Sequence, residues 1–496
     1  MPEMRIAIIG GGIAGLAAAY ELEKARAAGT PVEYTLFEAR ERLGGSLASE
    51  IVNGAVLEKG PDSFLTEKPA AIELCRELGL GAELLPSNDV ARKTYILVKN
   101  RLVALPDGLM FLVPTKLVPT ALTRLFSFST KVRMGLELLL PPRPSGLPDE
   151  AVAALVERHF GREAVDRLAD PLLSGIYGGD AAELSARTVL PRLVEMETQY
   201  GSLTRGMLAA HRQMRAKAKA SAKNNGHSNA GNGTGAKSAP RPIFTALRGG
   251  MQQLVDALVA RLDPASLRLA TPVSGIEKTA DGWKVDAGGK TDDYDAVIVA
   301  SPAWAAGVLL SKVDRALSEE LSAIPYSSSI TINLVYDENK LGKLPDGFGF
   351  LVPAIEGRAM LACTFVHRKF LGRTPLGNAV FRAFLGGIRN EALLTDTDEA
   401  LVAIVRRELS EILGEKTIGI AVEPVHTQVS RWRRAMAQYA VGHQERAARI
   451  AARVDALPGL RLAGNAYDGI GIPDCIRLGR KAAKELSASI AELSAK

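Results

Sequence analysis

The chain has 496 residues, of which 47% are hydrophobic and 23% charged, and its net charge is +6. This composition is typical of a soluble protein of two or three domains, and no run approaches the ~20 apolar residues of a membrane span. The basic residues are dispersed and aromatic residues make up only 5%, which argues against a nucleic-acid partner. Three distant cysteines and six scattered histidines give no disulfide framework and no metal-ligand spacing, so we expect a reducing cytoplasm and no metal.

The first forty residues follow the pattern of a dinucleotide-binding unit. Residues 5–9 predict a buried parallel strand, residues 16–28 a helix, and residues 34–37 a second strand that ends in Glu38. The G-x-G-x-x-G turn Gly10-Gly11-Gly12-Ile13-Ala14-Gly15 lies between the first strand and the helix. Gly10 permits the turn, Gly12 lets a pyrophosphate approach the backbone, and Gly15 lets helix and strand pack closely. We expect Glu38 to accept hydrogen bonds from a ribose diol; an ordinary βαβ turn is the alternative.

The segment after Glu38 indicates a flavin nucleotide. Its sequence is Ala39-Arg40-Glu41-Arg42-Leu43-Gly44-Gly45-Ser46. It resembles the second cofactor motif of the flavin amine oxidase and porphyrinogen oxidase superfamily. The resemblance implies that a basic residue meets the pyrophosphate and that Gly44 and Gly45 pass close to the flavin. Ser46 stands where many members have Arg or Lys.

The middle of the chain predicts loops and a helical insertion. By its composition Gly60-Pro61-Asp62-Ser63 is a loop, either a plain turn or a segment along the flavin ring. Residues 105–114 are apolar for a loop, so they form either a buried connection or a patch that touches membrane or substrate. Helical patterns cover 117–140 and 149–170. Residues 211–242 are low in complexity and predict a disordered surface loop, with a nucleic-acid-binding tail as the alternative.

The C-terminal half predicts further strands and a second anion site. Residues 266–273, 282–285 and 294–302 are strand-like. Resemblance to flavoproteins with two dinucleotide-binding domains implies that the Val273 backbone meets an adenine, and a plain sheet edge is the alternative. Four more strand-like runs between 330 and 385 suggest an antiparallel sheet under a substrate pocket, and 397–413 an amphipathic helix. After Gly464 a Gly-rich loop leads into a helix near Pro473. Gly471, Ile472 and Pro473 would place that helix dipole at a reduced flavin's N1–C2=O edge, or form a simple helix cap.

Nearly the whole chain resembles the FAD-dependent porphyrinogen oxidases, the family of protoporphyrinogen oxidase and bacterial coproporphyrinogen III oxidase. The segments that carry the resemblance are Gly60-Pro61-Asp62-Ser63-Phe64, Leu105-Pro106-Asp107-Gly108-Leu109, Ser174-Gly175-Ile176-Tyr177-Gly178-Gly179-Asp180, Gly347-Phe348-Gly349-Phe350-Leu351-Val352-Pro353, Phe384-Leu385-Gly386-Gly387, Gln438-Tyr439-Ala440-Val441-Gly442-His443 and Gly469-Ile470-Gly471-Ile472-Pro473-Asp474-Cys475. Ala437 stands where the family usually has Pro.

The resemblance implies oxidation of a reduced tetrapyrrole that carries propionates. Flavin N5 takes a hydride from a bridging carbon, a pyrrole N–H loses a proton, and O₂ reoxidises the flavin with release of H₂O₂. A backbone carbonyl at Gly175 would steady developing positive charge, and Leu351, Thr364 and Phe384 would line the pocket. Arg92 or Lys93 would meet a propionate. These basic residues, with Arg101, favour coproporphyrinogen III over protoporphyrinogen IX.

Three alternatives stay open on the sequence alone. A flavin amine oxidase needs a pocket for a neutral amine, and a carotenoid desaturase needs a long apolar tunnel. A redox-inactive carrier, like the GDP-dissociation inhibitors, is built on the same fold. Such carriers have lost the intact pyrophosphate loop, whereas Gly10, Gly12, Gly15 and Glu38 are all present here.

We therefore expect an α/β protein, α+β overall, with a Rossmann-like FAD-binding domain, an antiparallel-sheet substrate domain and a helical insertion. Expected partners are a tetrapyrrole and O₂ but no nucleic acid, with peripheral membrane contact or hand-off to another haem-pathway enzyme, in a cytoplasmic monomer or homodimer. The expected boundaries are 1–92, 243–305 and 426–496 for FAD binding, 93–205 for the helical, membrane-facing part, 206–242 for the disordered loop and 306–425 for the substrate domain.

Overall fold

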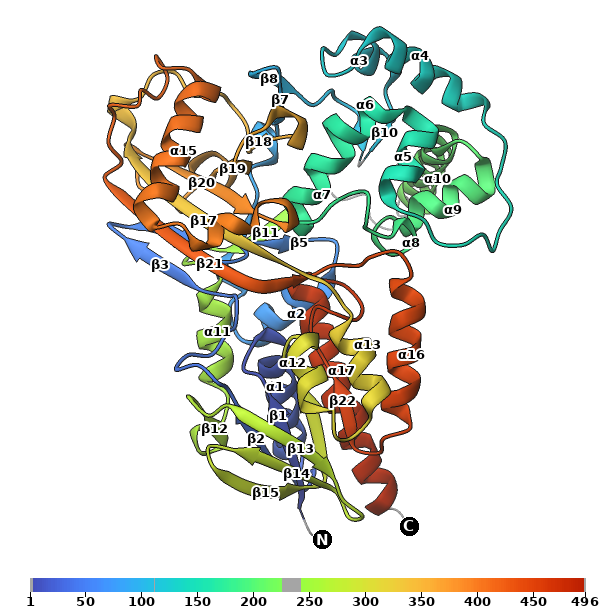
Figure 1. Ribbon diagram of the computed structural model, residues 1–496, viewed down its shortest axis with the longest axis vertical. Helices are drawn as coiled ribbons and strands as arrows, with labels where there is room; N and C mark the ends of the chain where they lie inside the picture. Colours follow the sequence, from blue (N-terminus) through green and yellow to red (C-terminus); the bar gives the residue numbers. More distant parts are fainter. Residues whose placement is uncertain (1–2, 111, 225–241, 495–496) are drawn as a thin grey trace.

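The computed structural model describes residues 3–110, 112–224 and 242–494. It has three parts that meet at the middle of the molecule (Figure 1). A parallel sheet wrapped in helices forms the lower part, a large mixed sheet the upper left, and a group of helices the upper right. This arrangement confirms the expected fold class.

The lower part is a five-stranded parallel sheet. Its order is β12 (Leu267–Arg268), β2 (Val32–Phe37), β1 (Met4–Ile9), β16 (Ala296–Val299) and β22 (Leu460–Leu462). Because side chains alternate along a strand, β1 buries Ile6 and Ile8 on one face and Ala7 and Ile9 on the other. The sheet is therefore covered on both faces, as parallel sheets are.

Different elements cover the two faces. Helices α1 (Ile13–Ala27), α2 (Pro69–Glu77), α11 (Gln252–Val259) and α17 (Ile472–Ser494) pack on the first. On the second lie the antiparallel meander β13 (Val273–Lys278), β14 (Trp283–Ala287), β15 (Lys290–Tyr294) and helices α12 (Ala303–Leu309), α13 (Arg315–Ser322) and α16 (His443–Asp455). The strand expected over 266–273 is shorter than predicted, since only Leu267–Arg268 joins the parallel sheet.

The upper left part is a seven-stranded sheet. Its order is β21 (His426–Ala437), β17 (Tyr326–Asp337), β20 (Asn378–Gly386), β19 (Met360–Phe365), β18 (Gly349–Leu351), β7 (Thr94–Val98) and β8 (Arg101–Ala104). Only the β18–β7 pairing is parallel. Helix α15 (Asp398–Leu413), capped by the Thr397 side chain, covers its apolar face.

The strands of the seven-stranded sheet differ from two of the expected domain boundaries, those at residues 92–93 and 425–426. Strands β7 and β8 belong to it rather than to the helical part, and β21 belongs to it rather than to the last FAD-binding piece. The partners of these strands lie far away in sequence, so local patterning does not reveal which sheet a strand joins.

Smaller sheets connect the parts. Strands β5 (Phe64–Leu65), β11 (Phe244–Leu247) and β6 (Leu84–Pro86) form one, β3 (Ser49–Val52) and β4 (Ala55–Glu58) a hairpin, and β9 (Leu109–Met110) pairs with β10 (Val113–Pro114). The short helix α14 (Val366–Lys369) follows β19.

The upper right part is the expected helical insertion. It contains α3 (Leu117–Leu122), α4 (Phe128–Leu136), α5 (Val152–Phe160), α6 (Arg162–Ala164), a π-helical turn over Val165–Ala169, α7 (Asp170–Tyr177), α8 (Ala186–Val189), α9 (Pro191–Tyr200) and α10 (Leu203–Asn224). Among the described residues, no helix combines the length and the apolar character needed to cross a bilayer.

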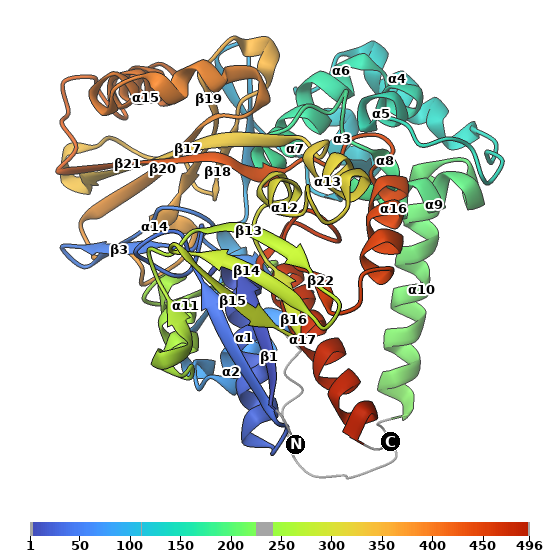
Figure 2. The same cartoon turned by 60° about the horizontal axis from the view of Figure 1, so that its bottom comes forward.

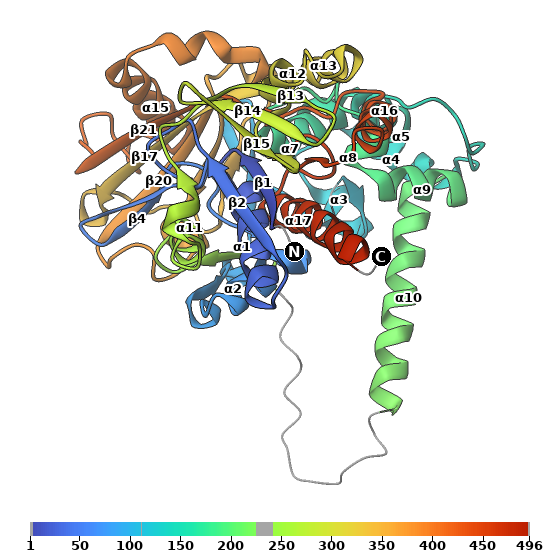
Figure 3. The same cartoon turned by 90° about the horizontal axis from the view of Figure 1, so that it is seen from below.

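Helix α10 corrects the expected disordered loop. The segment from residue 206 was expected to be unstructured, but it is helical to Asn224 and extends away from the rest of the chain (Figures 2 and 3). Ala, Lys, Arg and Met are strong helix formers, so the helix propensity of this segment outweighs its low complexity. The rest of the expected loop, 225–241, lies outside the described residues.

Candidate functional site

The carboxyl ends of the parallel strands bring the predicted cofactor residues together. Gly10 follows β1, Glu38 follows β2, and Gly464 lies just beyond β22. Glu38 accepts hydrogen bonds from the N–H of Gly11 (Oε2, 2.8 Å) and the N–H of Arg40 (Oε1, 2.9 Å). The hydroxyl of Ser301, just beyond β16, is buried with no hydrogen-bond partner among the described residues. In open α/β sheets this edge is where ligands bind.

The start of α1 fits a diphosphate. Gly12 is its N-cap, no side chain caps the helix, and no acidic residue occupies the first turn. A Cβ on Gly12 would meet nothing within 4 Å, whereas one on Gly15 would overlap the Gly10 carbonyl oxygen. The N–H groups of Ile13, Ala14 and Gly15 therefore start a helix whose positive end faces open space.

The second glycine loop lies against the first. The Gly44 N–H donates to the Gly11 carbonyl (2.8 Å), and a Cβ on Gly45 would lie 3.1 Å from the Gly12 Cα. The Arg42 guanidinium donates to the carbonyls of Leu43, Gly45 and Leu47. Burial, with the charge of Arg40, lowers the Arg42 pKa. Arg42 thus braces its own loop, while Ala39 and Arg40 are exposed.

Val273 and the Gly60 segment also lie at this site. The N–H of Thr271, two residues before Val273, donates to the Glu38 carbonyl (2.9 Å). A Cβ on Gly60 would overlap the carbonyl oxygen of Ser46, so the segment Gly60–Ser63 passes directly against the second glycine loop. The sequence-predicted cofactor segments are therefore neighbours in space.

The start of α17 is the second expected anion site, and the structure adds an ion pair there. The Asp474 carboxylate accepts from the Gly471 N–H (3.2 Å) and pairs with Lys68 Nζ (2.6 Å). Ile472 and Pro473 open the helix, which packs along α1 so closely that a Cβ on Gly479 would overlap the Ala14 carbonyl. Asp474 thus caps part of the helix end.

A buried charge cluster under the Gly60 segment was missed by the sequence reasoning. Asp62 pairs with Lys369 (3.0 Å) and Arg382 (3.4 Å), and Arg373 pairs with Glu58 (2.9 Å). Arg382 also donates to the Gly60 carbonyl. No local pattern indicates this cluster, because each ion pair joins residues more than 300 positions apart in sequence.

The predicted pocket residues share one face of the large sheet. Cα pairing aligns Leu351 with Ala362, Ala362 with Phe384, and Thr364 with Arg382. Paired residues point the same way, so Leu351, Thr364 and Phe384 line one face, opposite the face that α15 covers. Arg382 lies over the Phe384 ring at 4.8 Å. A Cβ on Gly175 of α7 would lie 3.1 Å from Leu351 Cδ2, so α7 borders this face.

Arg92 and Lys93 stand at the edge of the same sheet. They precede β7, and the Lys93 carbonyl accepts from the Phe348 N–H (2.8 Å) next to β18. Both side chains are exposed, and no ion pair to another described residue occupies either of them. They therefore stand at the Gly349 end of β18, where Gly349 pairs with Thr364, and not at its Leu351 end.

A nucleotide site that fits a diphosphate, joined to a separate sheet with the expected substrate residues on one face, is the arrangement of a flavin-type oxidoreductase. Residues 13–487 match the family model described as flavin containing amine oxidoreductase, and the chain belongs to this family.

Relatives within the family narrow the comparison. The chain is 33% identical to coproporphyrinogen III oxidase of Bacillus subtilis (strain 168) over 97% of both chains. It is 28% identical to protoporphyrinogen oxidase 2, chloroplastic/mitochondrial, of Arabidopsis thaliana over 97% of this chain and 93% of that one. A crystal structure from Exiguobacterium sp. 255-15, provisionally named a protoporphyrinogen oxidase, matches with a TM-score of 0.83 and 30% identity over 99% of this chain and 100% of that one.

Proposed function

We propose that this enzyme oxidises coproporphyrinogen III to the porphyrin, with bound FAD and with O₂ as the final acceptor. The observation that carries the proposal is that similarity to porphyrinogen oxidases spans both the cofactor loops and the pocket side. The pocket residues Gly175, Leu351 and Phe384 are neighbours in space. A carrier without redox chemistry would not need both halves of such a site.

FAD is the flavin that the nucleotide site suits. A ribose diol donates to a carboxylate such as Glu38, a diphosphate fills the space beside Gly12, and both belong to a dinucleotide. The Gly44–Gly45 and Gly60–Ser63 segments would hold the ring, with Gly471 and Ile472 at its N1–C2=O edge. When bound, the flavin supplies at N5 the acceptor for a hydride.

The pocket residues would act mainly by positioning the macrocycle. Leu351 and Phe384 offer apolar contact to the pyrrole rings, and Thr364 lies between their strands. The C-terminal end of α7 would present carbonyls to the positive charge that develops as hydride leaves. Arg92 and Lys93 would hold propionates through charge-assisted hydrogen bonds. Coproporphyrinogen carries four propionates and protoporphyrinogen two, so exposed cations at the pocket edge favour the former.

The helical part would contact a membrane surface or the next enzyme of the pathway. Phe128, Val132 and Leu136 lie four residues apart on α4 and are exposed, and Leu122 of α3 and Leu139 are exposed as well. A stripe of this kind is unusual on a surface that meets only water. It is the kind of surface that a membrane or a protein partner would cover.

Anaerobic mixing with candidate substrates tests the proposal. The flavin-loaded enzyme is mixed with coproporphyrinogen III, protoporphyrinogen IX, a polyamine and phytoene while flavin absorbance is followed. We expect bleaching by porphyrinogens only, fastest with coproporphyrinogen III, then porphyrin fluorescence and H₂O₂ once air is admitted. Equal rates with both porphyrinogens would overturn the preference. Bleaching by the polyamine or phytoene alone would overturn the class of substrate.

A further inference from the structure

One guanidinium spans the helix that borders the pocket. Arg389 donates to both carboxylate oxygens of Asp170 (2.7 and 2.8 Å), the first residue of α7. The same group pairs with Asp180 (2.7 Å), three residues beyond the end of α7. Arg389 comes from the turn after β20, two residues beyond Gly387. It therefore ties both ends of α7 to the strand that carries Phe384.

Three carbonyls at the end of α7 accept hydrogen bonds. The Ser174 carbonyl accepts from the Gly178 N–H (2.9 Å), and the Gly178 carbonyl accepts from the Ile388 N–H (3.0 Å). The Tyr177 carbonyl accepts from both Gln438 Nε2 (2.6 Å) and Ser327 Oγ (3.0 Å). Besides Gly178 itself, the donors are Ser327 on β17, Ile388 just after β20 and Gln438 just after β21.

The two carbonyls between Ser174 and Tyr177 differ from these. Within the described part of the chain, no hydrogen bond reaches the carbonyl oxygen of Gly175 or of Ile176. Both residues are exposed, and Gly175 lies against Leu351 on the pocket face. Unpaired carbonyls at the end of a helix carry its negative partial charge.

We propose that Arg389 is a positioning residue that clamps α7 so that the Gly175 and Ile176 carbonyls stay aimed at the substrate. The inference rests on the proposed function, because the carbonyls would act on the positive charge that develops in a porphyrinogen. A π-helical turn, Val165–Ala169, directly precedes α7, so the helix begins at an irregular, deformable point. The clamp opposes rotation of α7 about that point.

Arginine is the only side chain that can make this clamp. Its planar group offers donors in several fixed directions, whereas a lysine ammonium is a point charge that cannot span two carboxylates bidentately. Hydrogen bonds to Asp170 outweigh partial burial and raise the pKa of Arg389. Burial raises the pKa of Asp180, but hydrogen bonds, including those from Arg389, outweigh it and hold that pKa below its ordinary value. The side chain is 37% exposed, so its loss should leave the global fold intact.

Four variants test the clamp: Arg389→Gln, Arg389→Lys, Asp180→Asn and the control Arg453→Gln. Arg453 is 43% exposed and contacts both oxygens of Asp314 far from the pocket, but it joins no second carboxylate across a helix, so it controls for the loss of a similarly exposed ion pair. With coproporphyrinogen III we expect kcat of Arg389→Gln to fall about tenfold or more, with KM changed less than about threefold. Lys should rescue only part of this loss, and Asp180→Asn should lie between Lys and wild type. The control should keep wild-type kcat.

The outcomes separate positioning from charge and from folding. Full rescue by Lys would overturn the clamp, because it would show that only the charge matters. Unchanged kcat in Arg389→Gln, or an equal fall in the control, would overturn it as well.

Hydrogen exchange gives a readout that does not depend on substrate. Amide exchange over residues 171–182 should speed up in Arg389→Gln and not in Arg453→Gln, with exchange over α5 unchanged in both. Unchanged exchange over 171–182 would overturn the clamp. A wild-type enzyme that oxidises no porphyrinogen would overturn the proposed function instead, and the exchange result would still decide whether Arg389 holds α7.

Discussion

Lys369 Nζ lies 3.0 Å from Asp62 Oδ2 although the two residues are 307 positions apart, and both side chains are largely buried. Asp62 belongs to the segment that passes beside the second glycine loop, and Lys369 ends α14 after the large sheet's β19 strand. This ion pair therefore fastens the cofactor half of the molecule to the substrate half. Arg382 reinforces it by donating to the Gly60 carbonyl of the same segment.

Replacement of Asp62 by Asn should destabilise the enzyme and weaken its hold on flavin. The change leaves Lys369 and Arg382 buried without their carboxylate, and breaking a buried pair in this way costs about 3–5 kcal/mol. Thermal unfolding and flavin release should both shift down in temperature. Asp314→Asn, which breaks the more exposed pair with Arg453, is the control and should cost about 1 kcal/mol or less. An equal loss in both variants would contradict the special role of the buried pair.

The same pair predicts an acid dependence. Burial favours the protonated form of Asp62, but Lys369 and Arg382 outweigh it and hold its pKa well below the ordinary range. A carboxylate with a depressed folded pKa stabilises the fold above its unfolded pKa of about 3.9, and this stabilisation is lost as pH falls below that value. Stability of the wild type relative to Asp62→Asn should therefore be constant from neutral pH to about pH 5 and should shrink at lower pH. A constant difference down to pH 3 would contradict this assignment.

Gly12→Ala should separate cofactor binding from folding. Gly12 has a φ of −71° and ψ of 177°, which alanine adopts without strain, and an added Cβ meets no protein atom within 4 Å. Loss of the glycine's backbone freedom stabilises the fold by ~0.4–1 kcal/mol, but alanine is a poorer helix N-cap than glycine, so the two effects should nearly offset each other. The methyl group fills the space that a diphosphate would use, so flavin affinity should fall at least about tenfold. The apoprotein's melting temperature and the flavin dissociation constant measure the two effects.

The control is Gly29→Ala, at a φ of +90° beyond α1, which should lower stability and leave flavin affinity unchanged.

These contrasts show how far the sequence predicts the molecule. The fingerprint from Gly10 to Glu38 is local, so a strand, a turn and a helix in the right order are sufficient to place it. Leu351, Thr364 and Phe384 were assigned by resemblance, and strand pairing brings them to one face. The charges of Lys369, Arg373, Arg382 and Arg389 gave no signal, because each is paired with a residue more than 100 positions away. Helix α10 was missed because low complexity was given more weight than helix propensity.

His159 predicts a stability that declines at alkaline pH. Its Nδ1 lies 2.9 Å from a Glu137 oxygen and its Nε2 3.0 Å from a Glu197 oxygen, in a fully enclosed site. Burial alone would lower the His159 pKa, but hydrogen bonds to both carboxylates outweigh it and raise it. A raised folded pKa stabilises the fold fully below the unfolded pKa of about 6.5, and this is lost as pH rises through the folded value. The difference in unfolding free energy between wild type and His159→Gln should be largest near pH 6 and narrow above neutral pH.

The pKa of His443 is shifted in the opposite direction to that of His159. Burial lowers its pKa to about 4, so the folded protein holds it neutral. Stability should then be lost as pH falls from about 6.5 towards 4, because His443 becomes protonated in the unfolded chain while it stays neutral in the folded chain. His443→Gln should remove that acid sensitivity and leave the alkaline limb unchanged. Identical pH profiles for the two variants would contradict both assignments.

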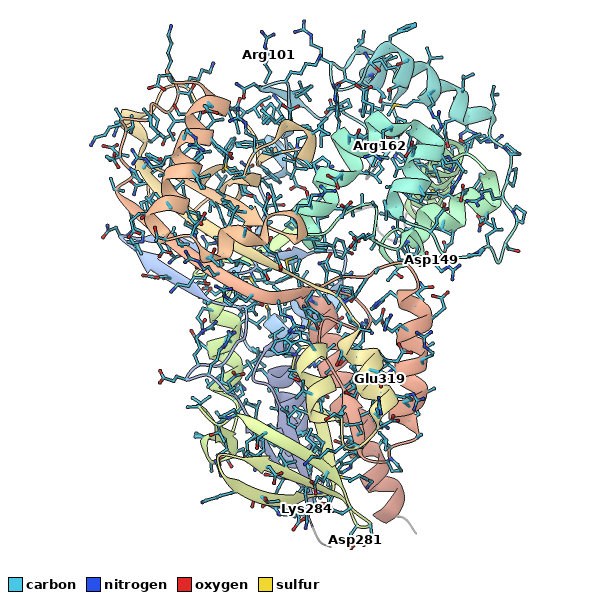
Figure 4. The ribbon with its side chains drawn as sticks, viewed as in Figure 1. Arg101, Asp149, Arg162, Asp281, Lys284 and Glu319 are labelled. Carbon is cyan, nitrogen blue, oxygen red and sulfur yellow. The ribbon has the colours of Figure 1, made fainter. Side chains whose placement is uncertain are left out.

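The last prediction concerns which cation meets a propionate. Arg92 and Lys93 are exposed, free of ion pairs to described residues, and adjacent to the strand that carries Leu351. Arg92→Ala and Lys93→Ala are compared with Lys284→Ala on β14, which lies at the opposite end of the molecule from Arg101 of the β7–β8 hairpin (Figure 4). Removal of the residue that binds a propionate should raise KM for coproporphyrinogen III about tenfold. The value of kcat should change little, because the contact is made equally in the ground state and the transition state. The effect should shrink at high salt and be smaller for protoporphyrinogen IX, which has fewer carboxylates. Unchanged KM in both variants, or an equal change in Lys284→Ala, would move the propionate site away from this edge of the sheet.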